Sequence, residues 1–364
     1  QEGTLDLQAT HNFHYRPTWD PDHEIFDASR SAIRMADWYA FKDPRQFYYG
    51  AYTLARAKQQ DTAEANFDFV ENRGLAATLP EDLRATVLAV LLPLRHVAWG
   101  GNMNGAFIAA YGYGTALTQP CLYHSMDQLG IAQYITRVGL LLGDDPSVLD
   151  EAKREWMEGE AWQGLRRYVE DSFVLKDPME LFVAQMVALD GLLYPLVYET
   201  IIDDVLAAQG GTPIAMLTQF MTDWYAETRK WVDATVKAAA AESPENKALL
   251  EKWIAHWRDR AASALMPVAQ IALGAQADAQ RVEHHILVAI AEGLRLGALI
   301  QDIRIENRHV ALPFPRLLLP RLKGLAHRSA RQARPICRYG RDRLEGATLR
   351  ADPLTALPRP RFFE

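Results

Sequence analysis

A chain of 364 residues, 49% of them hydrophobic and 10% aromatic, has enough apolar material for a buried core, so we expect a folded globular protein. Its net charge of −7 argues against a protein that binds nucleic acid mainly through phosphates. The longest apolar run, residues 85–94, is shorter than the roughly 20 residues of a membrane span, and the N-terminus lacks the pattern of a secretory signal. We therefore expect a cytoplasmic protein without membrane spans.

Residues 1–30 show no periodicity of helix or strand. They interleave aromatic side chains with Pro17 and Pro21, which favours an extended N-terminal arm. Its aromatic side chains need a surface to bury against, either the chain's own core or a partner.

Residues 31–300 carry the signals of a helical domain. Thr78 and Ser147 each begin a Ser/Thr-x-x-acid pattern that predicts a capping box, and Asp177-Pro178 and Ser243-Pro244 each place a capping residue before a proline at the first helical position. Four helix starts are thus predicted. After Ser243, apolar residues recur at helical spacing at Leu249, Leu250, Trp253, Ile254 and Trp257. Gly143–Pro146 and Gly210-Gly211 predict turns, and strand-like alternation is nowhere sustained, so the fold is predicted to be all-α.

Residues 301–364 differ from the rest in composition. They hold thirteen Arg, one Lys and six acidic side chains, a net +8 against −15 for the remainder. Pro313, Pro315, Pro320 and Pro335 would interrupt a long helix. This Pro/Arg-rich segment is either a basic tail or the product of a shifted reading frame in a GC-rich gene.

Long helices without strands are typical of a ferritin-like (ribonucleotide-reductase-like) bundle, which commonly holds a carboxylate-bridged diiron site. Such a site takes one carboxylate from each of two helices and a Glu-x-x-His pair from each of the other two. Among the ten histidines only His23 and His309 have an acid three residues earlier, at Asp20 and Glu306, and both lie outside the helical domain. No acid occurs between Asp82 and Asp127, so the helix in this stretch lacks a carboxylate for iron.

Two segments resemble the β subunits of bacterial multicomponent phenol hydroxylases, in the soluble diiron methane/phenol/toluene monooxygenase family. They are Phe47–Gln60, with the sequence FYYGAYTLARAKQQ, and Glu64–Glu71, with the sequence EANFDFVE, and the resemblance extends over about residues 1–300. In that family the α and β subunits share the ferritin-like fold, and only α binds iron, through two Asp-Glu-x-Arg-His motifs. The resemblance therefore implies a bundle without a diiron site.

Alignment with those two motifs identifies five degenerate ligand positions. The first motif corresponds to Asp127–Ile131 and the second to Asp223–Glu227. The ligand positions are occupied by Gln128 and Ile131 in the first motif, and by Trp224 and Glu227 in the second. Asp190 stands where a further carboxylate is expected, and one acid cannot hold two irons. We expect Asp190 to be a relic or a buried hydrogen-bonding group, and we expect no catalytic, cofactor-binding or metal-binding residue in this chain.

Other polar groups have more ordinary interpretations. His124 is spaced for a local helical hydrogen bond with Asp127, and the adjacent His284 and His285 point about 100° apart on a helix and so favour a surface or interface role. Trp224, Tyr225 and the Trp253/Trp257 pair are typical of a core or a subunit contact. The glycines of residues 100–105 favour close helix packing over a phosphate loop.

The resemblance implies a supporting role beside a catalytic subunit. The expected partners are a diiron α subunit and a small γ subunit in an (αβγ)2 complex, together with an effector protein and a reductase that passes electrons from NADH through FAD and a 2Fe-2S cluster. The complex would hydroxylate phenol with O2, and the choice among phenol, methylphenols and toluene would be set in the α subunit. Two alternatives remain open: a catalytic ferritin-like oxidase with unrecognised metal ligands, and a stand-alone helical module that binds a small aromatic molecule.

Overall fold

The computed structural model describes residues 20–24, 26–143 and 145–273 of the chain, and within these ranges the regular structure is helical and contains no strand. Within these ranges, the α-helices longer than ten residues are α3 (Tyr49–Asn72), α4 (Glu81–Tyr111), α5 (Thr115–Leu142), α6 (Ser147–Glu158), α7 (Glu160–Ser172), α10 (Thr212–Glu242) and α11 (Pro244–Leu273). Short 3-10 turns are η1 (Ala28–Arg30), η2 (Trp38–Ala40) and η3 (Leu75–Thr78). The all-α prediction is confirmed.

One continuous helix, Pro178–Gln209, runs through the core and changes along its length between α, π and 3-10 geometry. It consists of α8 (Pro178–Phe182), η4 (Val183–Leu189), α9 (Asp190–Tyr194), η5 (Pro195–Leu206) and η6 (Ala207–Gln209). The η4 and η5 segments are π-helical, with seven and twelve residues, and so are wider than an α-helix. By length and composition this helix could cross a membrane, but its apolar window is wholly buried, as in the core helix of a soluble protein.

Helices begin at Pro178 and Pro244, as predicted, whereas α4 and α6 begin at Glu81 and Ser147, displaced from the predicted starts, and two of the predicted caps are wrong. Asp177 accepts hydrogen bonds from the N–H groups of Met179 and Glu180, and Ser243 accepts one from Asn246, as predicted. Thr78 does not cap α4: it is the last residue of η3, its hydroxyl donates to the Leu75 carbonyl, and Pro80 precedes the first residue of α4.

At the start of α6 the neighbouring aspartate takes the place of the predicted serine cap. Ser147 is the first residue of α6, and its N–H donates to Asp145 Oδ1 at 2.6 Å. Both errors arise because Thr, Ser and Asp side chains near a helix start can bond more than one local backbone group.

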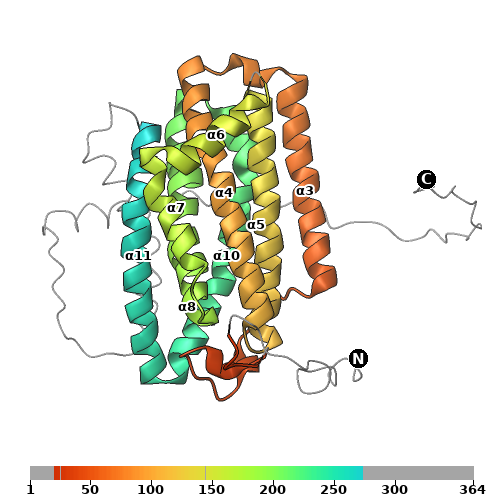
Figure 1. Ribbon diagram of the computed structural model, residues 1–364. Helices are drawn as coiled ribbons and strands as arrows, with labels where there is room; N and C mark the ends of the chain where they lie inside the picture. The colour runs from red at the N-terminus through yellow and green to blue at the C-terminus, as the bar shows by residue number, and fades with distance from the viewer. Residues whose placement is uncertain (1–19, 25, 144, 274–364) are drawn as a thin grey trace, which may run out of the picture. The chain divides into compact units, whose positions relative to one another are not determined.

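The helices stand roughly side by side, with α4 and α5 at the front of the bundle between α7 and α3 (Figure 1). The glycines of α4 permit a close approach of α5. A Cβ atom at Gly101 would lie 3.0 Å from the Gln128 side chain, and one at Gly105 would lie 2.9 Å from the Cys121 carbonyl oxygen. This agrees with the predicted packing role of residues 100–105.

The segment before α3 forms hydrogen bonds with the N-terminal ends of two later helices, α8 and α11. The N–H of Ala32 donates to the Asp177 carboxylate, and the N–H of Arg34 donates to Asn246 at the start of α11. Residues 20–24 and 26–30, from the predicted arm, contain η1 and the buried Arg30. The rest of the arm, residues 274–300 of the predicted helical domain and the predicted tail 301–364 lie outside the described residues, so these boundaries stay predictions.

Candidate functional site: the polar centre of the bundle

A chain of hydrogen-bonded side chains crosses the buried centre of the bundle. His124 on α5 has its Nε2 atom 2.7 Å from Asp190 Oδ2 on the Pro178–Gln209 helix. The other oxygen of Asp190 accepts from Gln185 at 2.8 Å, and Gln185 in turn accepts from Asn104 on α4 at 2.9 Å. Together with Gln128, these side chains are called the histidine cluster below. All five residues are buried, so α4, α5 and the central helix are tied together away from water.

Gln128 lies at the edge of the histidine cluster. Its Oε1 accepts from the Tyr194 hydroxyl at 3.2 Å, and its Nε2 lies 3.5 Å from Asp190 Oδ2. The ring of Trp224 lies 5.4 Å from the ring of His124, measured between centroids. His124 Nδ1 has no hydrogen-bond partner. In a neutral imidazole that donates through Nε2 to Asp190, this nitrogen is the one without a proton.

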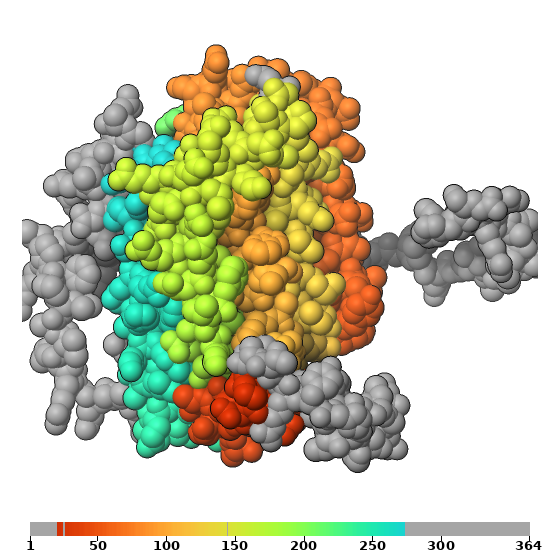
Figure 2. Space-filling model, viewed as in Figure 1, coloured from red at the N-terminus to blue at the C-terminus, as the bar shows by residue number. Residues whose placement is uncertain are grey.

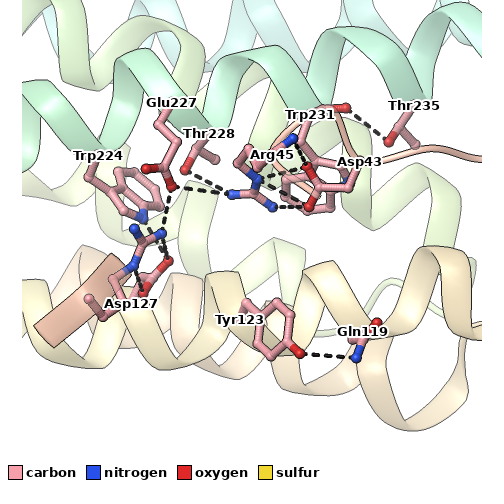
Figure 3. A network of polar contacts seen from close by, with 11 residues as sticks. Asp43, Arg45, Gln119, Tyr123, Asp127, Trp224, Glu227, Thr228, Trp231 and Thr235 are labelled. Carbon is pink, nitrogen blue, oxygen red and sulfur yellow. Dashed lines mark hydrogen bonds and ion pairs between the residues drawn. The ribbon is translucent and has the colours of Figure 1, made fainter. Parts of the chain in front are cut away.

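A second group of charges lies one turn farther along α5 and is called the arginine cluster. Asp127 accepts from Arg56 Nε at 2.7 Å and from a terminal nitrogen of Arg56 at 2.7 Å, which makes a bidentate pair. The Tyr52 hydroxyl and the Trp224 indole N–H also donate to Asp127, at 2.8 and 2.9 Å. The same terminal nitrogen of Arg56 donates to Glu227 on α10 at 2.9 Å. Figure 3 shows Asp127 facing Trp224 and Glu227 across the space between α5 and α10.

The electrostatics of the arginine cluster follow from burial and pairing. Burial alone would lower the pKa of Arg56, but its hydrogen bonds and charge interactions with Asp127 and Glu227 raise it above the usual value. Burial, the charge of Asp127 and the hydrogen bond to Asp127 raise the pKa of Tyr52. Tyr52 therefore stays a neutral donor and Arg56 stays a cation.

Arg45 extends the line of charges beyond Glu227. It forms a bidentate pair with Asp43, with contacts of 2.8 and 2.9 Å, and lies 3.9 Å from Glu227 (Figure 3). Its guanidinium also lies 4.9 Å from the centroid of the Trp231 ring. Acidic and basic side chains from several elements thus alternate in one line, in the order Asp127, Arg56, Glu227, Arg45 and Asp43.

The five predicted degenerate ligand positions do not share one environment. Gln128 and Asp190 belong to the histidine cluster, whereas Trp224 and Glu227 belong to the arginine cluster. Ile131 is fully buried in the apolar core and joins neither. Asp190 is a buried hydrogen-bonding group, which is one of the two roles expected for it.

The predicted local bond between His124 and Asp127 is wrong. Each side chain bonds across the bundle instead, His124 to Asp190 and Asp127 to Arg56. The partners on neighbouring helices are better placed than the residue one turn away: Arg56 supplies an opposite charge to Asp127 at 2.7 Å, and Asp190 lies 2.7 Å from the buried His124 ring.

The sequence patterns did not single out Arg56, nor Tyr52, Gln185 and Arg45, as residues of the polar centre. Arg56 lies inside the segment Phe47–Gln60 that carries the family resemblance. A signal was present, because Tyr52, Ala63, Phe67 and Val70 form the buried stripe of α3 and Arg56 follows Tyr52 by one turn. An arginine on the buried face of a helix needs a carboxylate partner.

The two clusters offer little to a metal ion. Among the described residues, no group of three or more His, Cys, Asp or Glu side chains is arranged to hold one. The carboxylates of Asp127 and Glu227 are neutralised by Arg56, and Asp190 is paired with His124. Ile131 and Trp224 supply no metal-binding atom. These side chains therefore do not fit a carboxylate-bridged diiron centre.

The remaining sequence candidates lie elsewhere. Asp20 bonds His23 at 2.9 Å and also pairs with Arg30. Tyr225, Trp253 and Trp257 are buried in the core and belong to neither cluster. The pair Glu306/His309, which is poorly placed for a metal site, and the adjacent His284 and His285 lie outside the described residues.

Comparison with known proteins identifies the family. Residues 19–243 match the model of the methane/phenol/alkene hydroxylases. The chain is 49% identical over 275 residues to the phenol 2-monooxygenase oxygenase component DmpL of Pseudomonas sp. strain CF600, covering 75% of this chain and 83% of that protein. It is 48% identical over 274 residues to the corresponding component MhpL of Acinetobacter pittii strain PHEA-2, covering 75% and 82%.

Solved structures agree with this relationship. Phenol hydroxylase from Pseudomonas sp. OX1, crystallised under xenon pressure, superposes with a TM-score of 0.74 at 43% identity, covering 84% of this chain and 90% of that one. Toluene 4-monooxygenase superposes with a TM-score of 0.63 at 23% identity, covering 68% and 82%, and so supports the fold. The predicted ferritin-like fold and the predicted resemblance are confirmed: the chain belongs to the methane/phenol/alkene hydroxylase family.

Proposed function

We propose that this chain is the iron-free β subunit of the oxygenase component of a multicomponent phenol 2-monooxygenase, and that it supports a catalytic diiron subunit. The observation that carries the proposal is the arginine cluster: the guanidinium of Arg56 supplies the positive charge between Asp127 and Glu227 that a metal would otherwise supply. The five residues Gln128, Ile131, Asp190, Trp224 and Glu227 are proposed as former ligand positions that no longer hold iron.

The proposed role of this chain is structural. Buried ion pairs and hydrogen bonds fix the spacing of α3, α5, α10 and the central helix, and a rigid bundle presents a fixed outer surface to a partner. The two relatives that share 48% and 49% identity are named oxygenase components of phenol 2-monooxygenase, which supports phenol as the substrate of the whole complex. A more distant relative, 27% identical, is named the beta subunit of the toluene-4-monooxygenase hydroxylase.

The proposed assembly contains one diiron α subunit, this chain and one small γ subunit, twice over, in the cytoplasm. An effector protein and a reductase with FAD and a 2Fe-2S cluster complete the system, and the reductase takes electrons from NADH. When bound in the α subunit, the diiron centre supplies the activation of O2. The residues of the present chain hold the bundle and do not contact the reacting atoms.

The direct test is a native mass spectrum with iron analysis of complexes purified from the source bacterium by a tag on this chain. We expect a heteromer whose iron remains with the partner subunit when the complex is dissociated. A lone chain that carries two irons would identify it as the oxidase itself, and a stable iron-free monomer that binds a small aromatic molecule would favour the binding module.

Conservative substitutions sharpen the test. Asp190→Asn and Glu227→Gln keep side-chain size while removing a carboxylate, and we expect the iron content of the intact complex to be unchanged. Loss of iron from a complex that still contains all its subunits would contradict the proposal. Expression of the α subunit without this chain should leave it insoluble or poor in iron.

A further inference from the structure

The outer face of α4 and α5 carries large apolar side chains that are about half exposed. Six of them are between 44% and 50% exposed and define what we call the α4–α5 face: Trp99, Met103, Leu122, Met126, Leu129 and Leu140. The four on α5 point within roughly 60° of one another at about 100° per residue. Figure 2 views the molecule from the side on which α4 and α5 lie in front, between α7 and α3. A connected apolar surface of this kind marks a binding surface more often than chance exposure does.

A groove of about 450 Å³ opens in this face between the two helices. Its walls include Arg95, His96 and Trp99 from α4, and Thr136 and Leu140 from α5. Apolar and cationic groups therefore meet in one shallow depression. The groove continues the apolar stripe of α5 rather than interrupting it.

Arg95 is the unusual member of the groove. It is partly buried, its guanidinium donates to the Leu149 carbonyl, and among the described residues no carboxylate lies within ion-pair distance of it. Burial lowers the pKa of Arg95, and the more distant Asp150 only partly opposes this. Arg137, at the opposite wall, is by contrast already paired with Glu64 and Glu71. An incoming carboxylate would therefore be attracted chiefly to Arg95.

His96 lies next to Arg95 and adds an uncharged polar ring to the same end of the groove. Burial and the charges of Arg95 and Lys153 lower the pKa of His96 to about 4, so the ring is neutral at pH 7. The ring stacks on Trp156, with centroids 5.6 Å apart, and is held in place. The groove thus offers one cation with a neutral hydrogen-bonding ring beside it.

The dimensions favour a helix over a small molecule. Leu122 and Leu140 are separated by five turns of α5, or roughly 27 Å at a rise of 1.5 Å per residue. A small aromatic acid would cover only the groove, whereas a helix laid between α4 and α5 would cover the whole stripe. We propose that the α4–α5 face docks an amphipathic helix of the iron-carrying sister subunit, and that an Asp or Glu of this helix binds Arg95. This inference rests on the proposed function, because it takes its partner from it.

The first test compares matched variants in the complex purified by a tag on this chain. Trp99→Glu, Leu129→Glu and Arg95→Glu should each lower the amount of sister subunit retained by at least about tenfold, which corresponds to about 1.4 kcal/mol. Trp99→Phe, Leu129→Met and the exposed Leu54→Glu on α3, where the native side chain is 67% exposed, should retain it. Thermal unfolding of each isolated variant verifies that the fold is intact.

The second test identifies the occupant of the face. Met103→p-benzoylphenylalanine, irradiated in the assembled complex, should cross-link to a helix of the iron-carrying subunit. A cross-link to a second copy of this chain or to its own residues 274–364 would overturn the inference, as would full retention of the sister subunit by all three glutamate variants. If the unsubstituted chain retains no iron-carrying subunit at all, the proposed function fails as well, so the two failures are distinguishable.

Discussion

The Nε2 atom of His124 lies 2.7 Å from Oδ2 of Asp190, a residue 66 positions later in the chain. Both side chains are buried, with exposed fractions of 0% and 3%. This bond joins α5 to the central helix at the place where that helix changes from π to α winding, because Asp190 is the first residue of α9. The N–H of Asp190 bonds to the carbonyl of Gln185, and its carboxylate accepts from the side chain of the same residue. Asp190 thus anchors the end of the π-helical segment from two sides.

The first prediction concerns this anchor. Asp190→Leu should lower the free energy of unfolding by about 3–5 kcal/mol, because it leaves His124 and Gln185 buried without their partner. The double variant His124→Leu/Asp190→Leu should recover part of that loss, since both members of the pair are then apolar. Urea unfolding followed by tryptophan fluorescence measures both. A double variant whose loss is the sum of two large single losses would argue that the pair is not coupled.

The second prediction concerns Arg56. Arg56→Met should cost about 3–5 kcal/mol of unfolding free energy, because it leaves Asp127 and Glu227 without their cation in a buried setting. Tyr52→Phe removes one hydrogen bond from the same carboxylate while Arg56 still balances its charge, and should cost about 1 kcal/mol. The difference between the two, measured by the same urea titration, separates charge balance from hydrogen bonding. Equal losses of unfolding free energy in the two variants would mean that Arg56 contributes no more than one hydrogen bond between neutral groups.

How much of this was predictable from the sequence depends on the range of each interaction. Asp177 and Ser243 cap helices through residues two or three positions away, so their patterns identify the helix starts correctly. Thr78 and Ser147 have the same kind of pattern, but the Thr78 hydroxyl donates to the Leu75 carbonyl, and the Ser147 N–H donates to Asp145. Local rules succeed where a single local partner is available.

The polar centre could not be predicted in the same way. Arg56 and Asp127 are 71 positions apart, and no spacing rule connects residues on different helices. Alignment predicts that Gln128 and Ile131 stand at former ligand positions, but it does not reveal that Arg56 pairs with Asp127 or that His124 bonds Asp190. Such pairings become visible only when the packing of the helices fixes which buried faces meet.

The third prediction is a loss of stability in alkali. Burial and then the charge of Asp127 raise the pKa of Tyr52, and burial raises the pKa values of Tyr194 and Tyr225, whereas tyrosines in the unfolded chain have a pKa of about 10. Above that pH the unfolded chain loses protons that the folded chain keeps, so the unfolding free energy falls as pH rises, and the stabilisation is fully present below it. Urea unfolding measured from about two pH units below this pKa to about one unit above it should show the slope.

The control for the alkaline effect is a matched pair of tyrosine variants. Tyr52→Phe should make the slope shallower by at most about 1.4 kcal/mol per pH unit, the contribution of one proton. Tyr48→Phe should leave the slope unchanged, because the Tyr48 side chain is 66% exposed. The same slope in both variants would show that Tyr52 takes no part in it.

The fourth prediction tests how closely α4 and α5 approach. Gly105→Ala should lower the unfolding free energy by about 1–3 kcal/mol, because its Cβ atom would lie 2.9 Å from the Cys121 carbonyl oxygen, and a backbone atom cannot rotate away. Gly130→Ala, in α5, meets nothing within 4 Å and should raise the unfolding free energy by about 0.5–1 kcal/mol, as expected for alanine in place of glycine within a helix. The two substitutions add the same methyl group, so their opposite signs isolate the packing distance from helix propensity. If Gly105→Ala were as stable as the unsubstituted chain in urea, the two helices could not lie as close as the structure places them.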